Sequence, residues 1–89
     1  MKQIHLFIQG DVIGVGFRAW TKIQAKIVGV TGWVKNAGDQ VEVVIQGDEE
    51  SVKKALSHVR RGPPISRVDR VDIVEEEIKK TFDEFEIRS

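Results

Sequence analysis

The spacing of the apolar residues switches between two periods along this chain, and the order of the switches constrains the fold more than any other feature. Ile4, Leu6 and Ile8 alternate with their neighbours, which predicts a strand with one core-facing side. From about Phe17 to Val28 the period is helical, and Gly29 is placed to end that helix. The apolar residues that recur at this helical spacing are Trp20, Ile23 and Ile27.

The middle of the chain predicts a hairpin followed by a second helix. Two extended runs, Val30 to Asn36 and Val41 to Gln46, are joined by the short segment 37–40. Asp48 is placed to cap a helix that ends before Gly62, and acidic residues in its first turn favour the start of that helix. Its predicted buried stripe is Val52, Ala55, Leu56 and Val59.

The last third predicts two more strands, whose apolar residues are Val68, Val71, Ile73 and Val74 in the first and Phe82, Phe85 and Ile87 in the short second one. The order is therefore βαββαβ with an extra terminal strand. This order predicts an α+β sandwich, in which two helices cover one face of an antiparallel sheet in the split βαβ arrangement. Right-handed crossovers place the first and third strands as central neighbours. With 89 residues, we expect one domain over residues 1–89.

A glycine-rich segment joins the first strand to the first helix and has the layout of an anion cradle. Gly10, Gly14 and Gly16 let the backbone N–H groups of residues 13–17 turn toward one point, and the first turn of the helix adds unpaired donors. Arg18, the only arginine before position 60, brings a planar cationic fork to the same place. Taken alone, the glycines are equally typical of a tight strand-to-helix turn. Together with Arg18 they predict a phosphoryl ligand.

The predicted topology brings a second polar residue toward this segment. The end of the second strand lies at Asn36, the only asparagine of the chain, and we expect it to approach the loop after the first strand. Arg18 and Asn36 are therefore predicted to share one pocket.

The composition excludes several kinds of chemistry. The chain has no cysteine, so it has no disulfide, thiolate metal site or thiol nucleophile. Lys plus Arg and Asp plus Glu both number 14, so the chain has no overall attraction for nucleic acid or anionic lipid. No apolar run approaches the roughly 20 residues that span a bilayer, and we expect a soluble, cytoplasmic protein. His5 and His58 are assigned to structure, because neither has further ligands at metal spacing.

Two separated motifs carry a family resemblance. The run from Gly10 to Arg18 resembles the first signature of the acylphosphatases, and Gly32 to Asn36, followed by Val41 and Gly47, resembles the second. The Gly62-Pro63-Pro64 segment and the Phe85 to Ile87 terminus also occupy matching positions, so the resemblance covers essentially the whole chain.

The resemblance implies a ferredoxin-like fold and an acylphosphatase activity, the hydrolysis of a carboxyl-phosphate anhydride to a carboxylate and inorganic phosphate. It implies that Arg18 binds the substrate phosphate and that Asn36 positions the attacking water. The other implied phosphate-binding residues are Ile13, Gly14, Val15, Gly16 and Phe17. It implies no metal and no organic cofactor. The expected partner is a small acyl phosphate, with no nucleic acid and no membrane, and the expected state is a monomer.

Two departures from the family pattern keep an alternative open. The family usually has Gln where Ile13 stands, and the turn after Asn36 is one residue shorter than usual, with Gln40 directly before Val41. The alternative is a noncatalytic or weakly active phosphate-binding module with the same fold. An RNA-recognition module is disfavoured, because the strand from Val41 has no aromatic residue to stack on bases.

Overall fold

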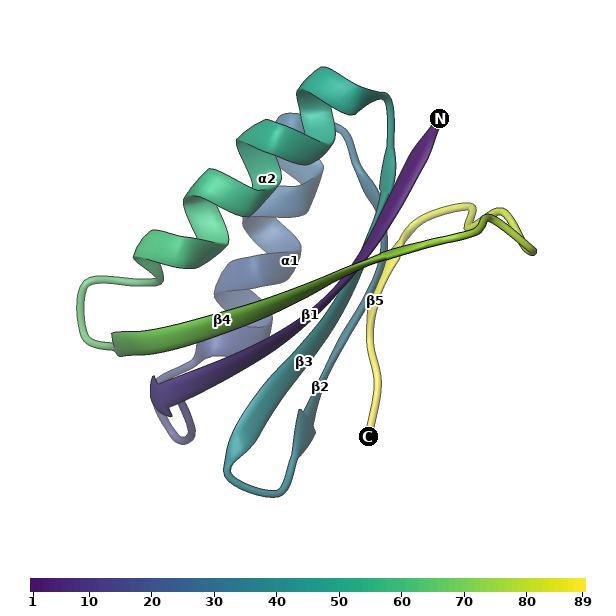
Figure 1. Cartoon of the computed structure of the whole chain (residues 1–89). Helices are drawn as coiled ribbons and strands as arrows, with labels where there is room; N and C mark the ends of the chain where they lie inside the picture. Colours follow the sequence, from purple (N-terminus) through teal and green to yellow (C-terminus); the bar gives the residue numbers. More distant parts are fainter.

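The computed structural model describes all 89 residues and places both helices on one face of a single sheet (Figure 1). The elements in chain order are β1 (Lys2–Asp11), α1 (Phe17–Val28), β2 (Thr31–Ala37), β3 (Gln40–Gly47), α2 (Glu49–Arg61), β4 (Arg67–Glu76) and β5 (Phe85–Ile87). The predicted order of strands and helices is confirmed, and so is the α+β sandwich.

The sheet has five strands in the order β4-β1-β3-β2-β5, so the first and third strands are central neighbours as predicted. The pairs among β1 to β4 are antiparallel, but β5 runs parallel to β2 and makes the sheet mixed rather than purely antiparallel. The reason is geometrical. Because β4 and β2 run in opposite directions, a strand that starts where β4 finishes and crosses to the β2 edge must run parallel to β2.

The core lies between the helices and the facing side of the sheet. Its strand residues follow the predicted alternation, and α2 contributes the predicted stripe, with Leu56 packed partly against it. The residues with 0% or 1% exposure that fill the centre are Leu6, Ile8, Val12, Val34, Val41, Val43 and Ile45. Asp48 caps α2 as predicted, since its Oδ1 accepts a hydrogen bond of 2.9 Å from the backbone N–H of Ser51.

The helix α1 has the predicted bounds and ends at Gly29, but of its three predicted apolar residues only Trp20 packs against the core. Its buried residues are Phe17, Thr21 and Ala25, whereas Ile23 and Ile27 are 56% and 70% exposed. Residues four apart lie on one side of a helix, and this side faces the sheet. Thr21 is tolerated there because its hydroxyl donates to the Phe17 carbonyl oxygen at 2.8 Å. The sequence pattern did not indicate this face, because a threonine and an alanine are less apolar than the isoleucines on the other side of the helix.

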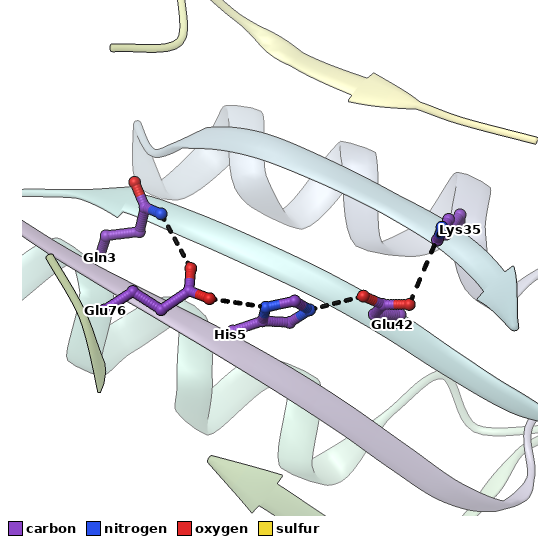
Figure 2. A network of polar contacts seen from close by, with 5 residues as sticks. All are labelled: Gln3, His5, Lys35, Glu42 and Glu76. Atoms are coloured by element: carbon purple, nitrogen blue, oxygen red, sulfur yellow. Dashed lines mark hydrogen bonds and ion pairs between the residues drawn. The ribbon is translucent and has the colours of Figure 1, made fainter. Parts of the chain in front are cut away.

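The opposite face of the sheet carries a polar network whose members come from β1, β2, β3 and β4 (Figure 2). His5 lies between two carboxylates, with Nε2 2.6 Å from Glu42 and Nδ1 2.9 Å from Glu76. Glu76 also accepts a hydrogen bond of 2.9 Å from Gln3, and Lys35 is 4.0 Å from Glu42. Hydrogen bonds from Gln3, and then from His5, lower the pKa of the Glu76 carboxyl. His5 is thus held by two carboxylates on the face of the sheet opposite the helices.

The connection from β4 to β5 is held by a buried glutamine that the sequence patterns did not single out. Gln46 is 1% exposed, and its Nε2 donates to the Lys80 carbonyl oxygen at 2.8 Å. Its Oε1 accepts a hydrogen bond of 3.1 Å from the backbone N–H of Phe82. A buried amide with both ends paired stabilises the loop path, and this path sets where β5 begins.

Candidate active site

The loop between β1 and α1 contains two glycines whose backbone conformation only glycine adopts readily. Gly14 has a φ of 78° and Gly16 a φ of 74°, while no other residue type in the chain has a positive φ. A Cβ at either glycine would meet nothing within 4 Å, so glycine serves the direction of the backbone there rather than close packing. Left-handed residues that alternate with ordinary ones make successive N–H groups converge, which forms a concave site for an anion.

The start of α1 adds further donors on the same side. Gly16 is the N-cap and provides no side-chain cap, and the first backbone hydrogen bond of the helix runs from Trp20 to the Gly16 carbonyl oxygen at 3.0 Å. The N–H groups of residues 17–19 therefore have no partner within the helix. The first turn also contains no acidic side chain. The positive end of the helix dipole is thus open to an anion.

A cavity of about 230 Å³ lies at this helix end. Its eight lining residues are Val12, Gly14, Gly16, Phe17, Arg18, Ala19, Asn36 and Ile87. Arg18 and Asn36 come from different elements, α1 and β2, and the structure brings both to this one cavity, as the topology predicted. Arg18 is the only charged residue among the eight and takes part in none of the ion pairs of the chain.

Two of the predicted phosphate-binding residues do not line the cavity with their side chains. Ile13 is 39% exposed, and Val15 packs against the hydrophobic core. Their contribution to an anion site is therefore limited to their backbone N–H groups. The departure from the family pattern at Ile13 therefore leaves the side chains that line the cavity unchanged.

Three lining residues were not predicted, namely Val12, Ala19 and Ile87. Val12 and Ala19 flank the predicted segment in the sequence, so a wider window around the glycine loop would have included them. Ile87 has no local signal, because its place beside the loop depends on the pairing of β5 with β2.

The hairpin that carries Asn36 is regular in spite of its short turn. Asn36 pairs with Val41 and Ala37 with Gln40, which leaves a two-residue turn with Gly38 at a φ of 66°. The β2–β3 ladder keeps one register from end to end, with no bulge. Asn36 is thus held by a continuous ladder at the cavity wall.

No group of three or more His, Asp or Glu side chains lies close enough together to hold a metal ion. Neither helix is long and apolar enough to cross a membrane.

The fold and the cavity define a class of protein, a ferredoxin-like α+β sandwich with a cavity at the start of its first helix. Comparisons with known proteins narrow this class. The family model described as acylphosphatase matches residues 4–87. An acylphosphatase of Methylococcus capsulatus is 43% identical over 88 residues, which cover 98% of this chain and 96% of that protein.

A second relative and a solved structure agree. An acylphosphatase of Pyrobaculum arsenaticum is 44% identical over 98% of this chain and 94% of its own length. The crystal structure of acylphosphatase from Bacillus subtilis superposes with a TM-score of 0.95 at 31% identity, over 100% of both chains. The chain belongs to the acylphosphatase family, and it is therefore an enzyme that hydrolyses acyl phosphates.

Proposed function

We propose that this protein cleaves small acyl phosphates by direct attack of a water molecule held by Asn36, while Arg18 and the backbone amides of residues 13–17 hold the phosphate. The products are a carboxylate and inorganic phosphate. The single observation that carries the proposal is the cavity at the start of α1, which Arg18, Asn36 and the two left-handed glycines line together.

The chemistry of an acyl phosphate suits a cavity of this composition. The leaving group is a carboxylate whose conjugate acid has a pKa of about 4, so it departs without a general acid. Phosphoryl transfer passes through a loose transition state with little bond formation to water, so positioning matters more than a strong base. The cavity offers no histidine and no carboxylate, and the proposed reaction requires neither.

Asn36 supplies a neutral side chain that suits the water. Its amide oxygen accepts a hydrogen bond from the water and leaves the oxygen lone pair free to attack phosphorus. The regular ladder of β2 and β3 holds the side chain at the wall of the cavity. A misplacement of about 1 Å lowers such a rate by roughly a hundredfold, so the register of this hairpin matters to activity.

Arg18 and the loop amides stabilise the charge on the phosphoryl oxygens. The guanidinium presents a planar fork of donors, and the N–H groups at the start of α1 have no competing acid beside them. Removing one donor of this kind typically lowers kcat by about 10²–10³. A lysine at position 18 retains the charge but not the two-pronged geometry.

The observation that favours the second candidate, a noncatalytic phosphate-binding module, is Ile13, whose apolar side chain can form no hydrogen bond with a bound phosphate. The two candidates differ in turnover and agree in phosphate binding. A monomeric state, a cytoplasmic location, and the absence of a cofactor and of nucleic-acid partners stay predictions.

The experiment measures the release of inorganic phosphate from benzoyl phosphate, with EDTA present, by the parent protein and by Arg18→Ala, Arg18→Lys and Asn36→Ala. Lys26→Ala serves as the matched control, because Lys26 is an exposed cation on α1 outside the cavity. We expect both alanine variants to lose about 100-fold or more in kcat/KM, the lysine variant to recover little, and the control to match the parent.

Inhibition by inorganic phosphate separates the two roles. We expect Asn36→Ala to retain the parental inhibition constant and Arg18→Ala to lose inhibition. A parent protein no faster than Asn36→Ala would establish the binding module instead. Parental phosphate inhibition of Arg18→Ala would contradict the assignment of the phosphate site.

A further inference from the structure

The cavity at the start of α1 is lined by two chemically different sets of residues. The first set consists of the two left-handed glycines, Arg18 and Asn36. The second set is apolar and consists of Val12, Phe17, Ala19 and Ile87. A phosphate dianion gains no favourable interaction from apolar side chains. An acyl phosphate is bipartite in the same way, because a charged phosphoryl group is joined to an organic acyl group.

The strand β5 directs Ile87 to this cavity. Phe85 pairs with Gly32 and is buried in the core, while Ile87 pairs with Val34 two residues further along. Side chains two apart on a strand point to the same face, so Ile87 points to the helix side of the sheet. Asn36 follows Val34 by two residues on β2 and points to that same side. Ile87 and Asn36 therefore meet at one cavity from adjacent strands.

The flanking residue Arg88 holds this strand in place. Its backbone N–H donates to the Val34 carbonyl oxygen at 2.8 Å, which extends the pairing beyond Ile87. Its guanidinium donates to Glu86 at 2.8 and 2.9 Å, and its Cζ lies 5.0 Å from the centroid of the Trp33 ring. These contacts place residues 86 and 88 on the other face of the sheet, which fixes the direction of Ile87.

Ile87 nonetheless remains 42% exposed, unlike Val12 and Phe17, which are at most 2% exposed and belong to the core. Core packing thus accounts for those two residues, whereas Ile87 lines the cavity and keeps apolar surface exposed to water. An apolar group of a bound ligand would remove this surface from water.

We infer that Ile87 contacts the acyl group of the substrate and determines a preference for acyl phosphates with a bulky apolar acyl group over acetyl phosphate. The inference rests on the proposed function, since it needs the phosphate bound by Arg18 and the loop amides. It adds that the acyl group lies along β5, on the side of Ile87.

The test compares kcat/KM for benzoyl phosphate with kcat/KM for acetyl phosphate in the parent, Ile87→Ala and Ile87→Leu. Ile27→Ala is the matched control, because it makes the same substitution at a 70% exposed position outside the cavity. We expect Ile87→Ala to lower the benzoyl-to-acetyl ratio by about three- to tenfold, since part of an apolar contact is lost. Ile87→Leu restores most of the ratio, and the control does not change it.

One further measurement makes the result specific. The inhibition constant for inorganic phosphate stays at the parental value in Ile87→Ala, because phosphate carries no acyl group to contact Ile87. An equal loss of kcat/KM for both substrates, or an unchanged ratio, overturns the inference. Failure of the proposed function shows elsewhere, in Arg18→Ala or Asn36→Ala that turn over like the parent, so the two failures are distinguishable.

Discussion

The two ends of α1 offer a matched test of the idea that the glycine loop is an anion cradle. Gly16, the N-cap, has φ 74° and ψ 22°, and Gly29, the C-cap, has φ 90° and ψ 33°. Both are left-handed, and a Cβ at either would meet no atom within 4 Å. The variants Gly16→Ala and Gly29→Ala therefore introduce the same backbone strain without a steric clash, one inside the proposed site and one at the far end of the same helix.

The expected loss of stability is similar for the two variants. A residue with a Cβ costs about 1–2 kcal/mol in the left-handed region. The lower entropy of the unfolded chain returns about 0.4–1 kcal/mol of this, so the net loss is about 1 kcal/mol. For a domain of this size that corresponds to a decrease in Tm of roughly 4–8 °C.

The expected loss of activity differs between them. At Gly16 the strain is relieved by turning the N–H groups of the first helical turn, and a displacement of about 1 Å lowers the rate by roughly a hundredfold. We therefore expect Gly16→Ala to lose about 10- to 100-fold in kcat/KM and to bind inorganic phosphate more weakly. Gly29→Ala stays within about twofold of the parent, since it lies outside the cavity.

The assay combines thermal unfolding with benzoyl phosphate hydrolysis and phosphate inhibition. Gly16→Asn is a useful third variant, because asparagine enters the left-handed region more readily than alanine and should recover part of both losses. The reasoning is refuted if Gly16→Ala loses stability as Gly29→Ala does but retains parental kcat/KM and phosphate inhibition.

Three further predictions concern the fold. Gly32→Ala places a Cβ 1.9 Å from the Val44 carbonyl oxygen, so the free energy of unfolding should fall by more than about 3 kcal/mol, and a parental melting curve would contradict this. Asp48→Ala removes the acceptor for the Ser51 N–H and should lower the urea midpoint, while Asp48→Asn keeps an acceptor and most of the stability; equal midpoints for Ala and parent would disprove the cap. The pKa of Glu76 is lowered from its ordinary value of 4.5, so its carboxylate stabilises the folded state at a pH above 4.5. This stabilisation is lost as the pH falls below 4.5. The urea midpoint of Glu76→Gln should therefore lie below the parental midpoint at about pH 7 and approach it at about pH 3, and a gap that stays constant would argue against the linkage.

The local elements of this protein follow from its sequence. Alternation in β1, the aspartate that caps α2 and the glycine that ends α1 all act within a few residues, so their signals are readable without knowledge of the fold. The same holds for the glycine loop and Arg18, which are neighbours along the chain. The shared cavity of Arg18 and Asn36 also followed, because the handedness of the crossover leaves few arrangements of the strands.

Only the tertiary structure decided which face of α1 is buried and where in the sheet the last strand, β5, lies. Thr21 and Ala25 face the core in place of the more apolar Ile23 and Ile27. Packing against the sheet determines which side of the helix is buried, and the helical period of the sequence alone does not. The parallel pairing of β5, and with it the position of Ile87 at the cavity, depends on a loop held by Gln46 from the middle of the sheet. Such contacts join residues tens of positions apart, and their free energy is gained only when the whole sheet has formed.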